Sequence, residues 1–127
     1  MCFGQLPKTE LLNGLAGNKL VIFTSDNGCA SYIGLSDINK PFRGWKLNHF
    51  EGGTHVPFMA KWSAQINAGS QLDAPIHHND IFATIAAAAA IEVPVDRQIG
   101  AVDLLSYIRK EATGVPHQTL FWREGYQ

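Results

Sequence analysis

Cysteine is scarce in this sequence, with two residues in a chain of 127. Cys2 and Cys29 are too few for a disulfide framework and, without other ligands, too few for a structural zinc site. Neither sign of charge dominates, because the formal net charge is −1, whereas a nucleic-acid-binding domain usually carries a clear excess of basic residues. We therefore expect no nucleic acid among the partners of this chain.

Long uninterrupted apolar runs are absent as well. No stretch reaches the length of a membrane span without a charged or turn residue. The N-terminus lacks the basic start and apolar run of a signal peptide. We expect no membrane partner, and the sequence leaves the cellular compartment open.

The sequence does contain enough apolar material for one core. Of its 127 residues, 46% are hydrophobic, and this length is typical of one domain rather than two. We therefore expect residues 1–127 to form a single domain.

The clearest predicted element is the run Leu-Val-Ile-Phe-Thr-Ser at residues 20–25. Its apolar and β-branched side chains follow one another without polar alternation, which is typical of a strand buried on both faces in the middle of an α/β sheet. Residues 9–16 predict the end of an amphipathic helix before it. Helix, short loop and buried strand together form half of an α/β unit.

The rest of the chain predicts few further strands, with helices between them. Residues 56–62 predict a second strand, with Pro57 near its start, where a missing donor matters least. The alanine-rich residues 80–91 predict a helix, capped by Asn79 or Asp80 and apolar nearly all round. The other predicted elements are a long loop over residues 29–55, a loop over 63–75, a short helix over 103–110 and a strand over 118–123. The predicted fold class is α/β, a sheet of few strands flanked by helices.

Asp26 and Asn27 follow the first predicted strand directly. In open α/β sheets, ligands bind just beyond the carboxyl ends of the strands. A carboxylate and an amide oxygen side by side suit a hard cation such as calcium or magnesium. The same Asp-Asn-Gly sequence is also ordinary turn chemistry, so the residues alone leave both interpretations open.

Several segments together resemble the sulfatase family of the alkaline phosphatase superfamily. Their order and spacing match as well as their residue types, and the resemblance runs from about residue 10 to residue 123. The matching segments are LVIFTSDNG at 20–28, FRGWK at 42–46, FEGGTHVPF at 50–58, DIFAT at 80–84, and PVDR at 94–97 with AVDLL at 101–105. The resemblance implies a partial alkaline-phosphatase-like sheet and a sulfuric ester hydrolase function.

The resemblance also implies roles for three residues. Asp26 and Asn27 match a pair that holds a divalent cation, usually Ca²⁺, and Asp26 would lie close enough to the nucleophile to polarise it. Lys46 matches a lysine that contacts the sulfate group, where a cationic donor stabilises developing charge. Arg43 could reach an anionic substrate, although an arginine at the base of a loop is more often a donor to carbonyl groups, and Lys46 without the resemblance would be an ordinary solvated lysine.

Departures from the family pattern limit these expectations. Neither Cys2 nor Cys29 lies in the Cys-x-Pro-x-Arg context that gives the family its formylglycine nucleophile. The N-terminal acidic pair is absent, and so are the histidine and lysine from the middle of the domain. Trp45 and Ala83 stand where glycine and proline are common. We therefore expect a match to the C-terminal part of a sulfatase catalytic domain, inactive alone, with a sulfate ester as partner only if the missing half is supplied.

Other interpretations remain beside the sulfatase one. The chain could be a truncated, non-catalytic α/β module that self-associates, or part of a related phosphoryl-transfer enzyme, although the context of Lys46 and Glu51 favours sulfate. His77 and His78 are adjacent and point in different directions on a strand or a helix, which makes joint zinc ligation awkward. His55, at the start of a predicted strand, is more often a packed residue than a catalytic one.

The first testable prediction concerns assembly. A central strand at 20–25 with few neighbours, and an all-apolar helix at 80–91, would expose an edge and a face that need cover. We therefore expect a homo-oligomer, with a two-fold dimer as the commonest solution. Light scattering at micromolar concentration tests this expectation, and a monomer with cooperative, concentration-independent unfolding would contradict it.

Overall fold

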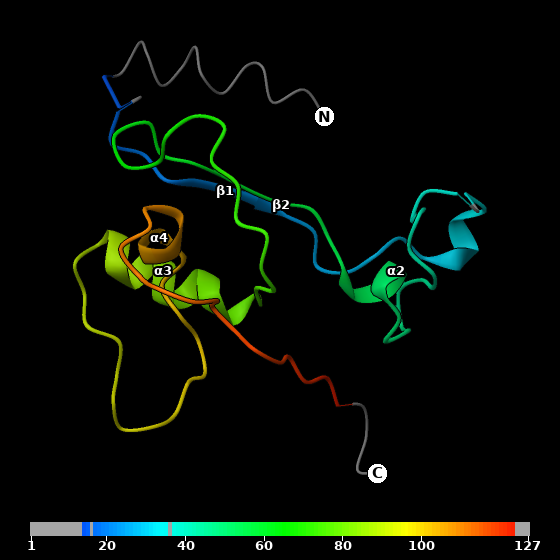
Figure 1. The fold of residues 1–127 in the computed structure, drawn as a ribbon. Coiled ribbons are helices and arrows are strands. Elements are labelled where there is room, and N and C mark those ends of the chain that lie inside the picture. Colours follow the sequence, from blue (N-terminus) through cyan, green and yellow to red (C-terminus); the bar gives the residue numbers. More distant parts are fainter. Residues whose placement is uncertain (1–13, 16, 36, 124–127) are drawn as a thin grey trace. The chain divides into compact units, whose positions relative to one another are not determined.

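A computed structural model describes residues 14, 15, 17–35 and 37–123. The helix expected at residues 9–16 lies almost entirely outside these residues. The described elements are β1 (Val21–Thr24), the short 3-10 helix η2 (Ser31–Ile33), α2 (Glu51–Thr54), β2 (Phe58–Lys61), α3 (Asn79–Ala88) and α4 (Leu104–Ile108). The fold is therefore mixed α/β, as the sequence predicts, with a two-stranded sheet and three α-helices in the described part (Figure 1).

The chain divides into two compact units, and each is described by itself. Residues 21–61 form the first, here called the strand unit. The described residues up to 20 and from 62 to 123 form the second, the helix unit. That residues 1–127 form a single domain stays a prediction. No helix among the described residues is long and apolar enough to span a membrane.

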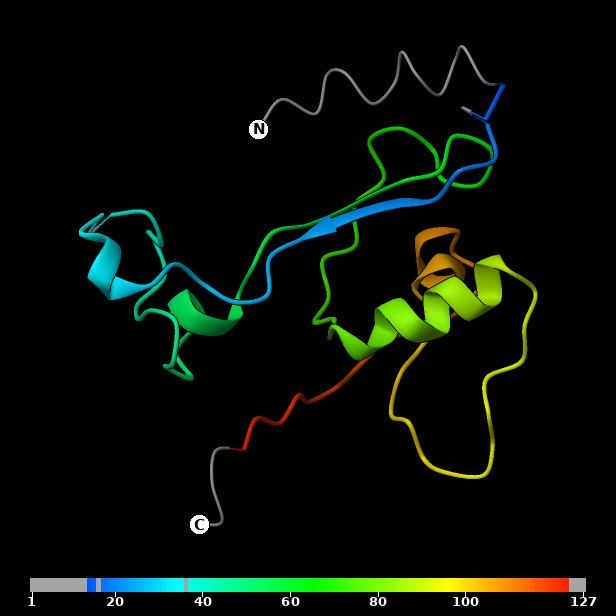
Figure 2. The same cartoon turned by 180° about the vertical axis from the view of Figure 1, so that it is seen from behind.

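The two strands of the strand unit pair antiparallel, with Val21 opposite Lys61 and Thr24 opposite Phe58. They lie side by side from the front and from behind (Figures 1 and 2). Both strands confirm the sequence prediction, within two residues at each end. The prediction that the first strand is central and buried on both faces is wrong for the described part, because β1 has a partner on one edge and its residues are half-buried.

Two other predictions need correction. The segment predicted as one loop over 29–55 contains the helical turns η2 and α2, and α2 is the short element that connects the loop to β2. Residues 118–123 form no strand. A strand must pair with another strand, and the described sheet consists of β1 and β2, although the apolar side chains of this run suit a sheet.

Asp80 ties the helix unit together. Its side chain is fully buried and accepts hydrogen bonds from the backbone N–H groups of His77 (2.7 Å) and Val102 (3.0 Å). His117 Nε2 lies 2.9 Å from both carboxylate oxygens. A buried carboxylate must be paired or hydrogen-bonded to be tolerated, and Asp80 achieves this by joining the start of α3 to two distant segments. The predicted cap is corrected here: His78 occupies the N-cap position and makes no side-chain cap bond.

Helices α3 and α4 pack against each other and share this network (Figures 1 and 2). The buried Thr84 hydroxyl accepts a hydrogen bond from Leu104 N at 3.0 Å. Asp103 caps α4 by accepting from Leu105 N and Ser106 N. Leu104 and Leu105, nearly fully buried, provide the apolar centre of the unit, as predicted for the helix over 103–110.

Both helices end in the same way, with a residue in the left-handed conformation. After α3, Ile91 N donates to Ala86 O and Ala90 N to Ala87 O, and Ala90 has a φ of 54°. After α4, Glu111 N donates to Ser106 O, Lys110 N donates to Tyr107 O, and Lys110 has a φ of 62°. This is the Schellman motif, in which glycine normally takes the left-handed position. It explains why α3 ends at Ala88 although the alanine run continues.

The Schellman motif at the end of α3 suggests a matched pair of substitutions. We expect Ala90→Gly to raise the free energy of unfolding by about 0.5–1 kcal/mol, because glycine relieves the left-handed strain that a Cβ creates. The same change at exposed Ala87, inside the helix, should lower it by about 0.5–1 kcal/mol. Urea denaturation followed by far-ultraviolet circular dichroism measures both.

The two variants carry the same Ala→Gly change but should shift the free energy of unfolding in opposite directions. The comparison therefore separates the local backbone geometry from a general effect of glycine. If both variants lose stability to the same extent, the left-handed closure at Ala90 is wrong.

Candidate functional site

The predicted site residues Asp26 and Asn27 lie directly beyond β1, in the strand unit. The Asp26 side chain is 79% exposed. Asn27 Nδ2 donates to Asp26 Oδ2, and Ser25 Oγ donates to the carbonyl oxygen of Asn27 at 2.8 Å. These short-range bonds make a turn that presents a carboxylate and an amide together. The turn and ligand interpretations of this sequence are thus compatible.

Lys46 comes from the loop before α2, twenty residues later in the chain. Its Nζ lies 3.9 Å from Asp26 Oδ2, and its side chain is 38% exposed. The structure therefore brings together three of the four residues that the sequence proposed, on one side of one unit. The Lys46 ammonium group can donate to an anion. The side-chain oxygens of Asp26 and Asn27, next to it, can bind a cation.

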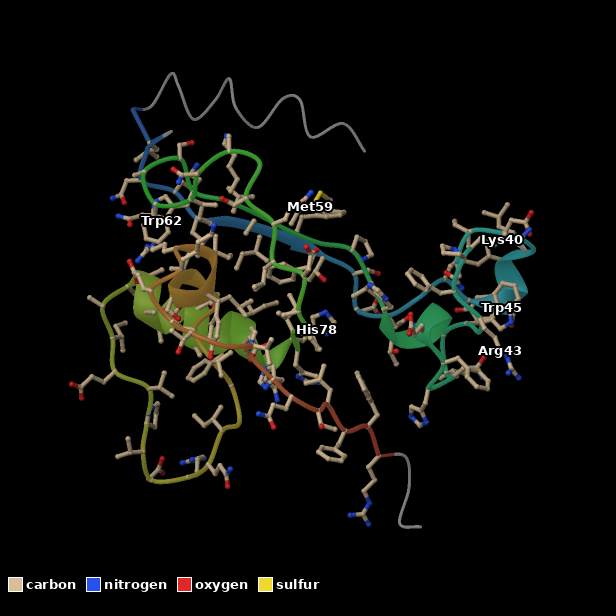
Figure 3. All side chains as sticks on the ribbon, in the orientation of Figure 1. Lys40, Arg43, Trp45, Met59, Trp62 and His78 are labelled. Carbon is tan, nitrogen blue, oxygen red and sulfur yellow. The ribbon has the colours of Figure 1, made fainter. Side chains whose placement is uncertain are left out.

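Arg43 is not part of this group in the described structure. Its guanidinium carbon lies 4.0 Å from the centre of the Phe50 ring, a cation–π contact, and its carbonyl oxygen accepts from Gly52 N at 2.6 Å. Figure 3 labels Arg43 in the same part of the strand unit as Lys40 and Trp45. These contacts favour the structural interpretation of Arg43 over direct binding of a substrate.

Three glycines allow close backbone contacts around the site, Gly28 with α2, and Gly52 and Gly53 with the loop that contains Lys46. A Cβ on Gly28 would lie 1.7 Å from Gly52 O. One on Gly52 would lie 2.3 Å from Gly44 O, and one on Gly53 would lie 2.1 Å from Asn48 O. Gly28 N also donates to Gly53 O at 2.9 Å. Only residues without a side chain allow these backbones to approach so closely, and the first turn of α2 thereby packs against the Asp26 loop.

Asn39 is a residue that the sequence interpretation missed. Its Oδ1 accepts from Cys29 N at 3.0 Å, while its Nδ2 donates to Cys29 O at 3.0 Å and to Gly44 O at 3.1 Å. Lys46 N also donates to Cys29 O at 3.1 Å. No periodic pattern marks a side chain that bonds to backbone groups five and ten residues away, so only the folded structure identifies it.

His55 and His77 make ring contacts with neighbouring side chains. His55 stacks on Phe42 with ring centres 4.2 Å apart, and its Nδ1 lies 3.3 Å from Glu51 Oε2. His77 lies at an angle to the rings of His78 and Trp122. Within the described residues, no three His, Cys, Asp or Glu side chains converge as a metal site would require.

One pair of charged residues shows shifted pKa values. The hydrogen bonds from the Arg97 guanidinium lower the pKa of Asp96, and the carboxylate in turn raises the pKa of Arg97. Both side chains are exposed neighbours in the loop after α3. Exposed ion pairs of this kind are common and contribute little, so these shifts do not mark a functional site.

Comparison with known families and proteins gives consistent matches. A model of the sulfatase family matches residues 9–91. The chain is 34% identical over 114 residues to the uncharacterized sulfatase YdeN of Escherichia coli, covering 90% of this chain and 20% of that protein. Steryl-sulfatase of the mouse is 37% identical over 114 residues, covering 85% of this chain and 18% of that protein. The chain therefore spans about a fifth of the length of these relatives.

Solved structures agree with these matches. Ps i-CgsB, solved in complex with k-i-k-neocarrahexaose, superposes with a TM-score of 0.73 at 27% identity, over 84% of this chain and 23% of that one. A structure from work on glycosaminoglycan metabolism by Bacteroides thetaiotaomicron gives a TM-score of 0.67 at 28% identity, over 86% of this chain and 25% of that one. The described fold thus corresponds to a portion of each structure.

The glycine contacts generate a second matched pair. We expect Gly28→Ala to destabilise the strand unit by about 2 kcal/mol or more, because its Cβ would overlap a backbone oxygen that cannot move aside cheaply. Gly17→Ala should change stability by less than about 0.5 kcal/mol, since nothing lies within 4 Å of a Cβ there. Urea titration followed through the amide signals of β1 and β2 measures the effect. A tolerated Gly28→Ala would contradict the close approach.

Proposed function

Since the chain belongs to the sulfatase family, we propose that it contributes one side of the active site of a sulfuric ester hydrolase. The observation that carries the proposal is the 3.9 Å distance between Lys46 Nζ and Asp26 Oδ2. In this proposal Lys46 contacts a sulfate oxygen, where its charge stabilises the negative charge that develops during cleavage. Asp26 and Asn27 face the same place with oxygen ligands.

We propose calcium as the cation. Carboxylate and amide oxygens are the ligands that this hard cation prefers, and it takes six to eight of them. Asp26 and Asn27 supply two, which fits a part of such a site and not the whole of it. Bound calcium would supply positive charge beside the sulfate group.

We further propose that this chain corresponds to the C-terminal part of a sulfatase catalytic domain and is inactive alone. The sequence contains no Cys-x-Pro-x-Arg motif, and binding groups cannot replace the nucleophile of covalent catalysis. The other ligands and the nucleophile would come from a longer natural chain or from a partner polypeptide. The substrate, once these are present, is a sulfate ester.

A second candidate function is a non-catalytic module that self-associates. Large apolar side chains of the α3 region favour it, because Phe82 is 50%, Ile85 51% and Ile91 65% exposed. Apolar patches of this kind on one element usually mark contact with another polypeptide. This candidate needs neither calcium nor sulfate.

A pair of binding and activity measurements tests the proposed function. We expect purified chain to give no turnover of an aryl sulfate and to bind calcium with a dissociation constant of roughly 1 mM or weaker, because two ligands leave the ion mostly hydrated. Calcium should shift the amide NMR signals of residues 26–28, and sulfate those around Lys46. Asp26→Asn should weaken the calcium response, and Lys46→Met should remove the sulfate response.

Matched controls come from the same unit. Asp37→Asn and Lys40→Met change an exposed ion pair with a 3.0 Å contact, and both responses should survive in them. Turnover that disappears in Lys46→Ala would refute inactivity of the isolated chain. Responses that are equal in the site and control variants would refute the proposed roles of Asp26 and Lys46.

A further inference from the structure

The ion pair between Lys46 and Asp26 is too weak to hold the two residues together by itself. Both side chains are substantially exposed and their charged atoms are 3.9 Å apart. Exposed pairs contribute little, because water screens the attraction and ordering two side chains costs entropy. Some other interaction must keep the Asp26 turn beside the Lys46 loop.

We propose that Asn39 is the positioning residue of this site. Its carboxamide lies between the backbone that follows Asp26 and Asn27 and the backbone that precedes Lys46. It bonds to both backbone groups of Cys29 and to the carbonyl oxygen of Gly44. The Cys29 carbonyl accepts from Lys46 N as well, so one acceptor joins all three segments.

The chemistry of the contact suits asparagine. A carboxamide has one oxygen acceptor and two N–H donors in a fixed plane, and here the oxygen meets an N–H while the nitrogen meets two carbonyls. This pattern also assigns the orientation of the amide. In the reversed orientation, the NH2 group of Asn39 would face the N–H group of Cys29, and its oxygen would face two carbonyl oxygens. Aspartate of the same shape lacks both donors, and alanine lacks all three bonds.

Asn39 therefore acts through Asp26 and Lys46 and touches no ligand itself. The inference rests on the proposed function, because it concerns the placement of the residues proposed to bind calcium and sulfate. Placement matters because misplacing a reacting group by about 1 Å can cost a factor of roughly 100 in rate. The placement itself can be measured without metal, substrate or activity, so its failure is distinct from failure of the proposed function.

A carbodiimide cross-link reports the placement directly. The reagent activates the Asp26 carboxyl, the Lys46 amine displaces the reagent as its urea, and an amide bond joins the two side chains. Peptide mass spectrometry then quantifies the Asp26–Lys46 cross-link in the chain as it exists. We expect Asn39→Ala and Asn39→Leu, which remove the hydrogen bonds without adding a carboxyl group, each to lower its yield by about fivefold or more, because the yield depends on proximity.

Three comparisons keep the result specific. Asn48→Ala should leave the yield unchanged, because Asn48 Oδ1 accepts one exposed bond, from Trp45 N three residues away. The Asp37–Lys40 cross-link is an internal standard, because Lys40 N also donates to Asp37 O at 3.1 Å within the same backbone turn. Amide NMR of β1 and β2 shows whether the unit still folds.

Each outcome decides the proposal. A lower Asp26–Lys46 yield with the strands and the Asp37–Lys40 yield intact supports positioning by Asn39. An unchanged yield in both Asn39 variants refutes it. Loss of the strand signals in both variants also refutes it, because Asn39 would then be required for folding rather than for positioning.

Discussion

The strand unit depends on the close approach of two stretches of backbone, at Gly28 and at Gly52 and Gly53. Side chains usually separate backbones in a folded protein, and here their absence allows carbonyl oxygens to occupy the space a Cβ would need. The contact fixes α2 against the Asp26 turn, and the three bonds of Asn39 fix the intervening loop. The side chains proposed for the site are therefore exposed groups on a backbone frame held by close contacts, an arrangement that favours preorganisation.

The sequence predicts this unit unevenly. Both strands are confirmed because a run of β-branched and apolar residues is a local signal. Asp26 and Asn27 were proposed as ligands because they follow a predicted strand. Lys46 joined them only through the family resemblance, since nothing local relates residues twenty positions apart. Asn39 was missed for the same reason. Arg43 matched the family motif, yet its guanidinium group makes a cation–π contact with the aromatic ring of Phe50.

The helix unit shows a different limit of sequence reasoning. Alanine propensity predicted α3 but not its end, because the left-handed conformation at Ala90 stops the helix while the composition remains favourable. The strand expected at 118–123 was wrong because strand formation depends on a partner. Asp80 matched a family segment, but its function as a buried acceptor for two backbone N–H groups and His117 required the folded structure.

The two units differ in how their residues are distributed along the chain, and this has a consequence for synthesis on the ribosome. The strand unit is continuous from residue 21 to residue 61, so all its contacts are available once that stretch has emerged. In the helix unit, the Asp80 carboxylate gains its contact with His117 only when that residue has emerged, 37 residues later. Domains fold as their segments emerge, and contacts distant in sequence form late. The strand unit is therefore the first of the two able to fold, while the nascent helix unit still lacks the contact between Asp80 and His117.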